Sequence, residues 1–172
     1  MTEAKPTDGA FRHASVMLEE TLEALAPRPG GVYADVTLGA GGHAAAILSR
    51  SGPDGRLVGI DRDPAALSAA ATRLAPFGER AQLRAGRFRE VARLLADAGA
   101  PRVDGLVADV GVSSPQLDDA ARGFSFRRVG PLDMRMDPTR GETARALVAR
   151  MSERELADVI YQLGEERRSR PI

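Results

Sequence analysis

The amino-acid sequence predicts an α/β fold in which helices cover a parallel sheet. Short, nearly continuous apolar runs alternate four times with segments whose apolar residues recur at helical spacing. This alternation favours parallel strands joined by right-handed crossovers. The first apolar run ends in Asp35 and leads into a glycine-rich turn at residues 39–42. In an open α/β sheet such a turn lets backbone N–H groups approach a nucleotide-like ligand closely, so a bound cofactor is expected.

Composition and charge define the class of protein. The chain has 172 residues, of which 43% are hydrophobic and 28% charged; this is typical of one globular domain, or of one domain and the start of a second. Its formal net charge is zero, so no overall field draws it to nucleic acid or to a membrane. The absence of cysteine excludes disulfides, thiolate metal sites and a cysteine nucleophile. Residues 1–9 are polar and no run approaches about 18 apolar residues, so we expect a cytoplasmic protein without a membrane span.

The first elements follow from apolar spacing and from the residues that end each run. A helix is predicted over residues 16–26, where leucines recur at helical intervals before a segment rich in proline and glycine. Residues 32–35 form the predicted first strand. The glycine turn then leads into a second helix that passes through Ile47 and Leu48.

The next elements repeat the pattern. Residues 56–61 read as the second strand, and Asp63 followed by Pro64 is typical of a helix start, with an N-cap and a proline in the first turn. The remaining predictions are an alanine-rich helix over 65–74, a strand over 81–85, a helix over 88–98 and a fourth strand over 103–109.

Beyond the fourth strand the alternation stops. Residues 110–140 are rich in glycine, proline, aspartate and arginine, and we predict a structured loop there. Two short helices follow, over 141–151 and 152–163, and the second opens with a capping box at residues 152–155. A doubly wound sheet usually has five or more strands, so we expect this incomplete sheet to be a piece of a longer protein.

Two acidic positions relate to the expected cofactor. Asp61 lies 22 residues after Gly39, at the end of the second strand. An acid at this offset accepts the ribose hydroxyls of an adenosine cofactor. For Asp63, capping of the next helix is a sufficient explanation. For the glycines alone, the alternative is that they only form a tight strand-to-helix turn.

The ends of the strands predict where the site lies. Ligands of open α/β sheets bind outside the carboxyl ends of the strands, so Asp35, Asp61 and Asp109 are expected to converge on one crevice. Phe88, just after the third strand, has two alternatives: it stacks on an adenine, or it packs in the core.

Six segments resemble those of a known family. They are His-Ala-Ser-Val-Met-Leu at 13–18, Gly-Gly-His at 41–43, Ile-Asp-Arg-Asp-Pro at 60–64, the segment 109–116, Arg-Gly-Phe-Ser-Phe at 122–126 and Gly-Pro-Leu-Asp-Met-Arg-Met-Asp at 130–137. Together they resemble the bacterial ribosomal RNA small subunit methyltransferase H family, also called MraW. The last two segments are specific to this family rather than general to methyltransferases.

The resemblance implies a class I methyltransferase with a Rossmann-like sheet. Such an enzyme uses S-adenosylmethionine to methylate the N4 amine of a decoding-centre cytidine in 16S rRNA, within the small ribosomal subunit. The resemblance is compatible with a homodimer and implies no metal site. The implied organisation is a polar leader at 1–12, a cofactor domain with the first four strands at 13–116, and the start of a helical substrate-recognition insert at 117–172. The implied cofactor-binding residues are Gly41, Gly42, His43, Asp61, Phe88, Asp109 and Gln116.

The chemistry assigns roles to a few further groups. We expect Asp109 to orient the target amine or the amino group of the cofactor, as a catalytic residue. The absence of cysteine argues against methylation at C5 of cytosine, which proceeds through a thiol adduct. Arginines in the loop after the pocket either contact RNA phosphates or pair with the aspartates between them; they are Arg122, Arg127, Arg128 and Arg135.

Two alternatives and three departures from the family pattern accompany this interpretation. A nicotinamide-dependent oxidoreductase also uses a glycine turn and a strand-end acid. A truncated chain that binds cofactor without catalysis is the second alternative, since an incomplete sheet leaves an open edge. The departures are Val36, Val110 and the helix-breaking Pro171.

Overall fold

The computed structural model describes residues 15–172 and contains two compact units, which meet in the sequence between Val110 and Gly111. Each unit is described by itself. The predicted leader at 1–12 and His13 lie outside the described residues, and the assignment of domains to 13–116 and 117–172 stays a prediction. Within the described part of the chain, no helix is long and apolar enough to cross a membrane.

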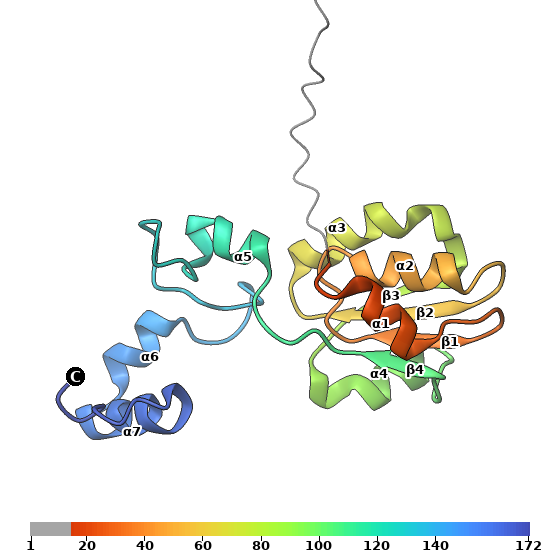
Figure 1. Cartoon of the computed structure of the whole chain (residues 1–172). Helices are drawn as coiled ribbons and strands as arrows, with labels where there is room; N and C mark the ends of the chain where they lie inside the picture. Colours follow the sequence, from red (N-terminus) through yellow and green to blue (C-terminus); the bar gives the residue numbers. More distant parts are fainter. Residues whose placement is uncertain (1–14) are drawn as a thin grey trace, which may run out of the picture. The chain divides into compact units, whose positions relative to one another are not determined.

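The first unit is built on a four-stranded, fully parallel sheet (Figure 1). Its strands are β1 (Val32–Asp35), β2 (Arg56–Asp61), β3 (Ala81–Ala85) and β4 (Gly105–Val107). The strand order β3-β2-β1-β4 places β1 between β2 and β4. The chain therefore builds outward from β1 to β3 on one side and crosses to the other side of β1 for β4. The predicted parallel α/β sheet is confirmed, and its order reverses between β1 and β4.

Helices cover both faces of this sheet. On one face lie α1 (Leu18–Leu25), α2 (Gly42–Arg50) and α3 (Pro64–Leu74), followed by the short helix η1 (Ala75–Arg80); on the other lie η2 (Phe88–Glu90) and α4 (Val91–Asp97) (Figure 1). The side chains of each strand alternate between two buried clusters. Tyr33 and Leu57 pack beneath α1, α2 and α3, whereas Ala34 and Val58 pack against α4. This burial on both faces explains why the strand sequences are almost continuously apolar.

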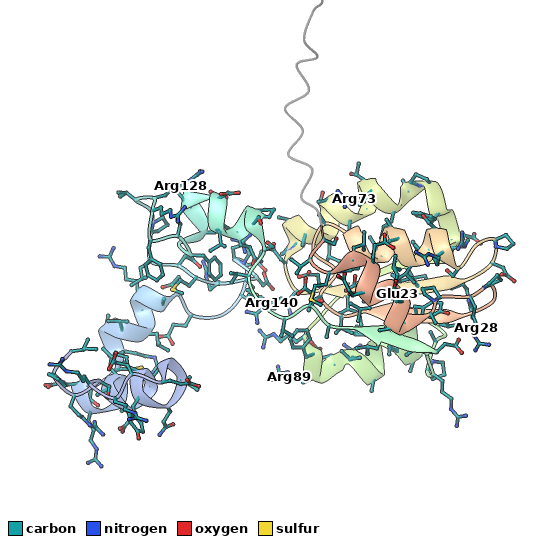
Figure 2. The ribbon with its side chains drawn as sticks, viewed as in Figure 1. Glu23, Arg28, Arg73, Arg89, Arg128 and Arg140 are labelled. Carbon is teal, nitrogen blue, oxygen red and sulfur yellow. The ribbon has the colours of Figure 1, made fainter. Side chains whose placement is uncertain are left out.

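The fourth strand is shorter than predicted, and side chains take part in its hydrogen bonds to β1 and its neighbours near both ends. Before β4, the Asp104 N–H donates to the Val32 carbonyl at 2.7 Å, and the Asp104 carboxylate accepts the N–H of Val32 at 2.8 Å. The same carboxylate pairs at 2.7 Å with Arg28, which is labelled in Figure 2. After β4, the N–H of Asp109 donates to the hydroxyl of Thr37 at 2.7 Å. The predicted strand over 103–109 thus keeps only Gly105–Val107.

Two other boundaries differ from the sequence predictions. The predicted helix over 88–98 begins as a separate 3-10 turn, where the Glu90 carboxylate accepts the N–H of Arg87 at 3.0 Å. The predicted loop over 110–140 contains a short helix, opened by reciprocal hydrogen bonds between Ser113 and Gln116. That serine and glutamine form a capping box, so the sequence carried a signal for this helix that the prediction missed.

The second unit is helical and contains irregular segments. Its helices are α5 (Ser114–Asp118), η3 (Ala120–Arg122), α6 (Ala144–Arg150) and α7 (Glu153–Gly164). The last two confirm the predicted pair of helices. Ser152 caps α7, with the Glu155 carboxylate accepting the Ser152 N–H at 2.9 Å.

Two valines of the first unit provide a matched test of this core. Val58 is 3% exposed between the sheet and α4, whereas Val110 is 72% exposed. Val58→Ala is expected to lower the free energy of unfolding by about 2 kcal/mol, because it removes buried methyl groups and leaves a cavity. Val110→Ala is expected to change it by less than about 0.5 kcal/mol. Urea unfolding followed by circular dichroism measures both; equal effects of the two substitutions would contradict the described core.

Candidate functional site

The carboxyl-terminal edge of the sheet brings together the three strand-end acids. Asp35 is in register with Gly59 of β2 and with Val107 of β4, so Asp61 and Asp109 each lie two residues beyond its partners. The register therefore places the three acids at one edge of the sheet, whereas their convergence on one crevice stays a prediction. This edge includes the reversal of strand order between β1 and β4, which is where ligands of open α/β sheets bind.

The glycine turn has a geometry that only glycine adopts without strain. Gly41 has φ +78° and caps α2, which begins at the next residue. A Cβ at Gly41 would also come within 3.4 Å of Ala70 and Leu74 of α3. The first N–H groups of α2 have no partner within the helix and carry its positive end. The turn therefore presents backbone donors at the same edge as the acids.

Asp61 fixes the glycine turn to the end of β2. One carboxylate oxygen accepts the N–H of Gly39 at 2.8 Å, and the other accepts the N–H of Asp63 at 2.9 Å. A carboxylate oxygen accepts two hydrogen bonds, so each oxygen keeps one acceptor position. Asp63 itself caps α3 by accepting the N–H of Ala65 at 3.0 Å, as the sequence predicts.

His43 holds the start of the described chain against α2. Its ring is 8% exposed, and Nε2 lies 3.0 Å from the carbonyl oxygen of Val16. Because a carbonyl only accepts, Nε2 carries the hydrogen. The structure thus gives His43 a structural contact that the sequence did not predict; its role in binding a cofactor stays a prediction.

Asp35 is the buried member of the three acids. Asp35 is 1% exposed. Its Oδ1 accepts the N–H of Thr37 at 3.1 Å, whereas Oδ2 has no hydrogen-bond partner among the described residues. Burial raises the pKa of Asp35 from 3.8 to about 6, against the opposing effects of the Thr37 hydrogen bonds and the charge of His43; the nearby Asp61 raises it further. An unpaired buried carboxyl oxygen is costly, and it lies at the edge where a ligand is expected.

The exposed residues of the site differ in their surroundings. Asp109 is exposed, and only its backbone N–H forms a hydrogen bond with another described residue. Phe88 is 59% exposed, so the alternative in which this ring packs in the core is wrong. Gln116 belongs to the second unit, where it is 6% exposed and its side chain caps α5. The roles of these three residues in binding or catalysis stay predictions.

The four arginines that the sequence relates to RNA differ in whether their side chains have partners within the second unit. Arg135 forms two hydrogen bonds to Asp133, at 2.7 and 2.8 Å, and they lower the pKa of that carboxyl to about 2. Arg122 donates to the carbonyl oxygens of residues 135 and 136 at 3.1 and 2.8 Å. Arg128, labelled in Figure 2, contacts the carbonyl and carboxylate of Asp118. Internal pairing thus accounts for three of the arginines, whereas the Arg127 guanidinium has no partner among the described residues.

One surface depression of the first unit does not coincide with these acids. Its volume is about 570 Å³, and it lies at the opposite edge of the sheet, where β2 and β3 begin. Charged and polar side chains line it, from Asp54, Arg56, Glu79, Arg80 and Gln82. Arg80 is already bound there to the carbonyl oxygens of Leu48 and Gly55. We therefore place the candidate site at the carboxyl-terminal edge.

Comparisons with known proteins relate this chain to one family. Residues 10–172 match the model of the MraW methylase family. The chain is 58% identical over 167 residues to Ribosomal RNA small subunit methyltransferase H of Sorangium cellulosum, covering 97% of this chain and 52% of that protein. It is 55% identical over 158 residues to the protein of the same name from Symbiobacterium thermophilum, covering 92% of this chain and 50% of that protein. The chain thus spans about half the length of the curated relatives it matches.

The raised pKa of Asp35 predicts a specific pH dependence of stability. Between about pH 4 and pH 6 the folded protein keeps a proton on Asp35 that the unfolded chain has released. The free energy of unfolding therefore falls as pH rises through this window, by about 3 kcal/mol in total. Asp35→Asn cannot ionise and is expected to lack this fall.

Urea unfolding at pH values from 4 to 8 measures the effect. The stability of Asp35→Asn relative to the wild type is expected to increase as pH rises from 4 to 7. Asp97→Asn, which changes an exposed carboxylate on α4, serves as the control. In this variant the free energy of unfolding is expected to fall with pH as in the wild type, because Asp35 is still present. Parallel pH curves for wild type and Asp35→Asn would show that Asp35 titrates normally.

Proposed function

The chain belongs to the MraW methylase family, and from this membership we propose that its protein is a methyltransferase that uses S-adenosylmethionine to methylate 16S rRNA. The observation that carries the proposal is the 58% identity to a Ribosomal RNA small subunit methyltransferase H over 97% of this chain. That match includes the glycine turn and the strand-end acids. The more specific target is the N4 amine of a decoding-centre cytidine, in the cytoplasm and within the small ribosomal subunit.

The residues at the sheet edge fit the chemical groups of this cofactor. The free acceptor positions of Asp61 suit the two hydroxyls of a ribose. The exposed ring of Phe88, after β3, suits stacking on an adenine. The glycine turn and the start of α2 provide close backbone approach through Gly41, Gly42 and His43. When bound, the cofactor supplies an electrophilic methyl group on a sulfonium.

The protein's contribution to such a transfer is chiefly positioning. A methyl group moves in line from sulfur to an attacking nitrogen, so the reaction depends on the orientation of the amine. The lone pair of a cytosine amine is delocalised into its ring. A hydrogen bond from this amine to the exposed carboxylate of Asp109 orients the group and favours localisation of the lone pair on nitrogen. We therefore propose Asp109 as the catalytic residue.

Contact with RNA is proposed for one loop of the second unit. A base inside folded RNA must leave its stack to reach a pocket, while phosphate contacts fix the register. The Arg127 guanidinium has no partner among the described residues, although the backbone N–H of this residue donates to the Ser125 hydroxyl. The neighbouring Phe126 is fully exposed. A free guanidinium beside an exposed aromatic ring suits a phosphate and an unstacked base. Arg122 and Arg135 instead hold this unit together.

Titration calorimetry tests the cofactor assignment. S-adenosylmethionine is expected to bind, and NAD is not. Asp61→Asn is expected to raise the dissociation constant for S-adenosylmethionine at least about tenfold, because the variant loses the charged acceptor of the ribose hydroxyls. Asp97→Asn, with the same change of charge away from the site, is expected to bind as the wild type does. Tight binding of NAD, or an unchanged constant in Asp61→Asn, would contradict the assignment.

The same protein then identifies the product. Small ribosomal subunits that lack the modification are incubated with labelled S-adenosylmethionine and the protein that contains this chain. Nucleosides from the digested 16S rRNA are expected to carry the label as N4-methylcytidine. Label on another atom or nucleoside would exclude the N4 assignment, and binding without any transfer would support the alternative of a cofactor-binding fragment.

Arg127→Ala tests the proposed RNA contact. The substitution is expected to weaken binding to small subunits and to reduce by about one the slope of log affinity against log salt, because one phosphate contact is lost. Arg102→Ala, an exposed arginine of the first unit, is the control with the same change of charge. Filter binding over a series of salt concentrations measures both variants. Identical slopes for the wild type and Arg127→Ala would exclude the phosphate contact.

A further inference from the structure

The hydroxyl of Thr37 joins two segments of the site that are far apart in the sequence. Its oxygen accepts the backbone N–H of Asp109 at 2.7 Å. Its own hydrogen points to Oδ1 of Asp35, at a longer oxygen-to-oxygen distance of 3.4 Å. The direction is fixed, because an amide N–H only donates and the Thr37 oxygen must accept from it. The short bond to Asp109 is the stronger of the two.

This contact lies where the backbone ladder between β1 and β4 ends. The last backbone bond described across these strands runs from the Val36 N–H to the Val107 carbonyl, at 3.0 Å. Two residues further along the chain, the threonine side chain replaces the backbone as acceptor. Asp109 has no other hydrogen bond among the described residues, and both it and Val110 are exposed. The Thr37 hydroxyl is thus the polar contact that holds the backbone of Asp109 to the sheet.

The two residues that Thr37 connects differ in exposure. Asp35 is buried at the end of β1 and is fixed by its neighbours, whereas the Asp109 carboxylate is exposed. The link crosses the point where the strand order reverses, which is the ligand-binding position of open α/β sheets. A single hydroxyl therefore links the exposed Asp109 to the buried end of β1.

We propose that Thr37 is a positioning residue, whose hydroxyl sets the backbone of Asp109 for methyl transfer. The inference rests on the proposed function for its kinetic consequence, and on the hydrogen bonds alone for its geometry. A displacement of about 1 Å at a reacting group costs on the order of a hundredfold in rate. Because Asp61 and the glycine turn do not depend on Thr37, loss of the hydroxyl is expected to act on the transfer rate more than on cofactor affinity.

Two substitutions separate the hydroxyl from the shape of the side chain. Thr37→Val keeps the branched shape and removes the hydroxyl, whereas Thr37→Ser keeps the hydroxyl and removes a methyl group. At saturating S-adenosylmethionine, Thr37→Val is expected to slow transfer by about 10- to 100-fold, and Thr37→Ser is expected to stay within about threefold of the wild type. The dissociation constant for S-adenosylmethionine is expected to change by less than about threefold in both variants.

Amide hydrogen exchange at Asp109 provides a readout that does not depend on activity. The Asp109 amide is expected to lose protection in Thr37→Val and to keep it in Thr37→Ser, because only the hydroxyl accepts its hydrogen bond. If the wild type transfers no methyl group, the proposed function fails, and the exchange data still decide whether Thr37 holds Asp109. The inference would be overturned if Thr37→Val transferred the methyl group as fast as the wild type. It would also be overturned if the exchange rate of the Asp109 amide were unchanged in this variant. Equal slowing in both variants would show that packing of the side chain, not its hydroxyl, matters.

Discussion

The arrangement of the site depends on the parallel pairing of β1 with a strand on each side. β2 and β4 run in the same direction as β1, so the carboxyl ends of all three strands lie at one edge. Burial on both faces fixes the register, since a shift of one residue would exchange the residues beneath α2 with those beneath α4. The acids at the strand ends are therefore held in place by hydrophobic packing that is remote from them. Asp61 and Asp109 lie only two residues beyond the partners of Asp35 in the sheet, so the pairing of the strands largely fixes where these acids lie.

The three acids of this edge have distinct environments although they share one residue type. Asp35 is buried with one unpaired oxygen, Asp61 uses both oxygens to hold backbone N–H groups, and the side chain of Asp109 is exposed. Burial favours the neutral form of the Asp35 carboxyl and raises its pKa. The same type of side chain is thus a buried acid, an acceptor that fixes the glycine turn, and an exposed carboxylate for which we propose the catalytic role.

The sequence predicted the elements whose bounds depend on the local pattern of apolar and turn residues. Val32–Asp35, Arg56–Asp61 and Ala81–Ala85 were predicted at their observed bounds. The first two are buried strands, whose apolar runs end in turn residues. The length of β4 could not be predicted, since the hydrogen bonds near its two ends join Asp104 and Asp109 to Val32 and Thr37, each 72 residues away in sequence. The link between Thr37 and Asp109 was missed for the same reason. The α5 helix was missed although its capping box was present, because the surrounding glycines, prolines and charges favoured a loop.

Two arginines of the second unit have a further consequence for the RNA contact that we propose for this unit. Arg122 reaches across the loop to carbonyl oxygens 13 and 14 residues further along the chain, and Arg135 is locked to Asp133. These bonds fix an irregular segment that lacks a hydrophobic core of its own. The entropy of ordering that segment is lost when the protein folds, and not when it binds. A segment that is ordered in advance can combine a modest number of contacts with fast, selective association, because association does not wait for folding.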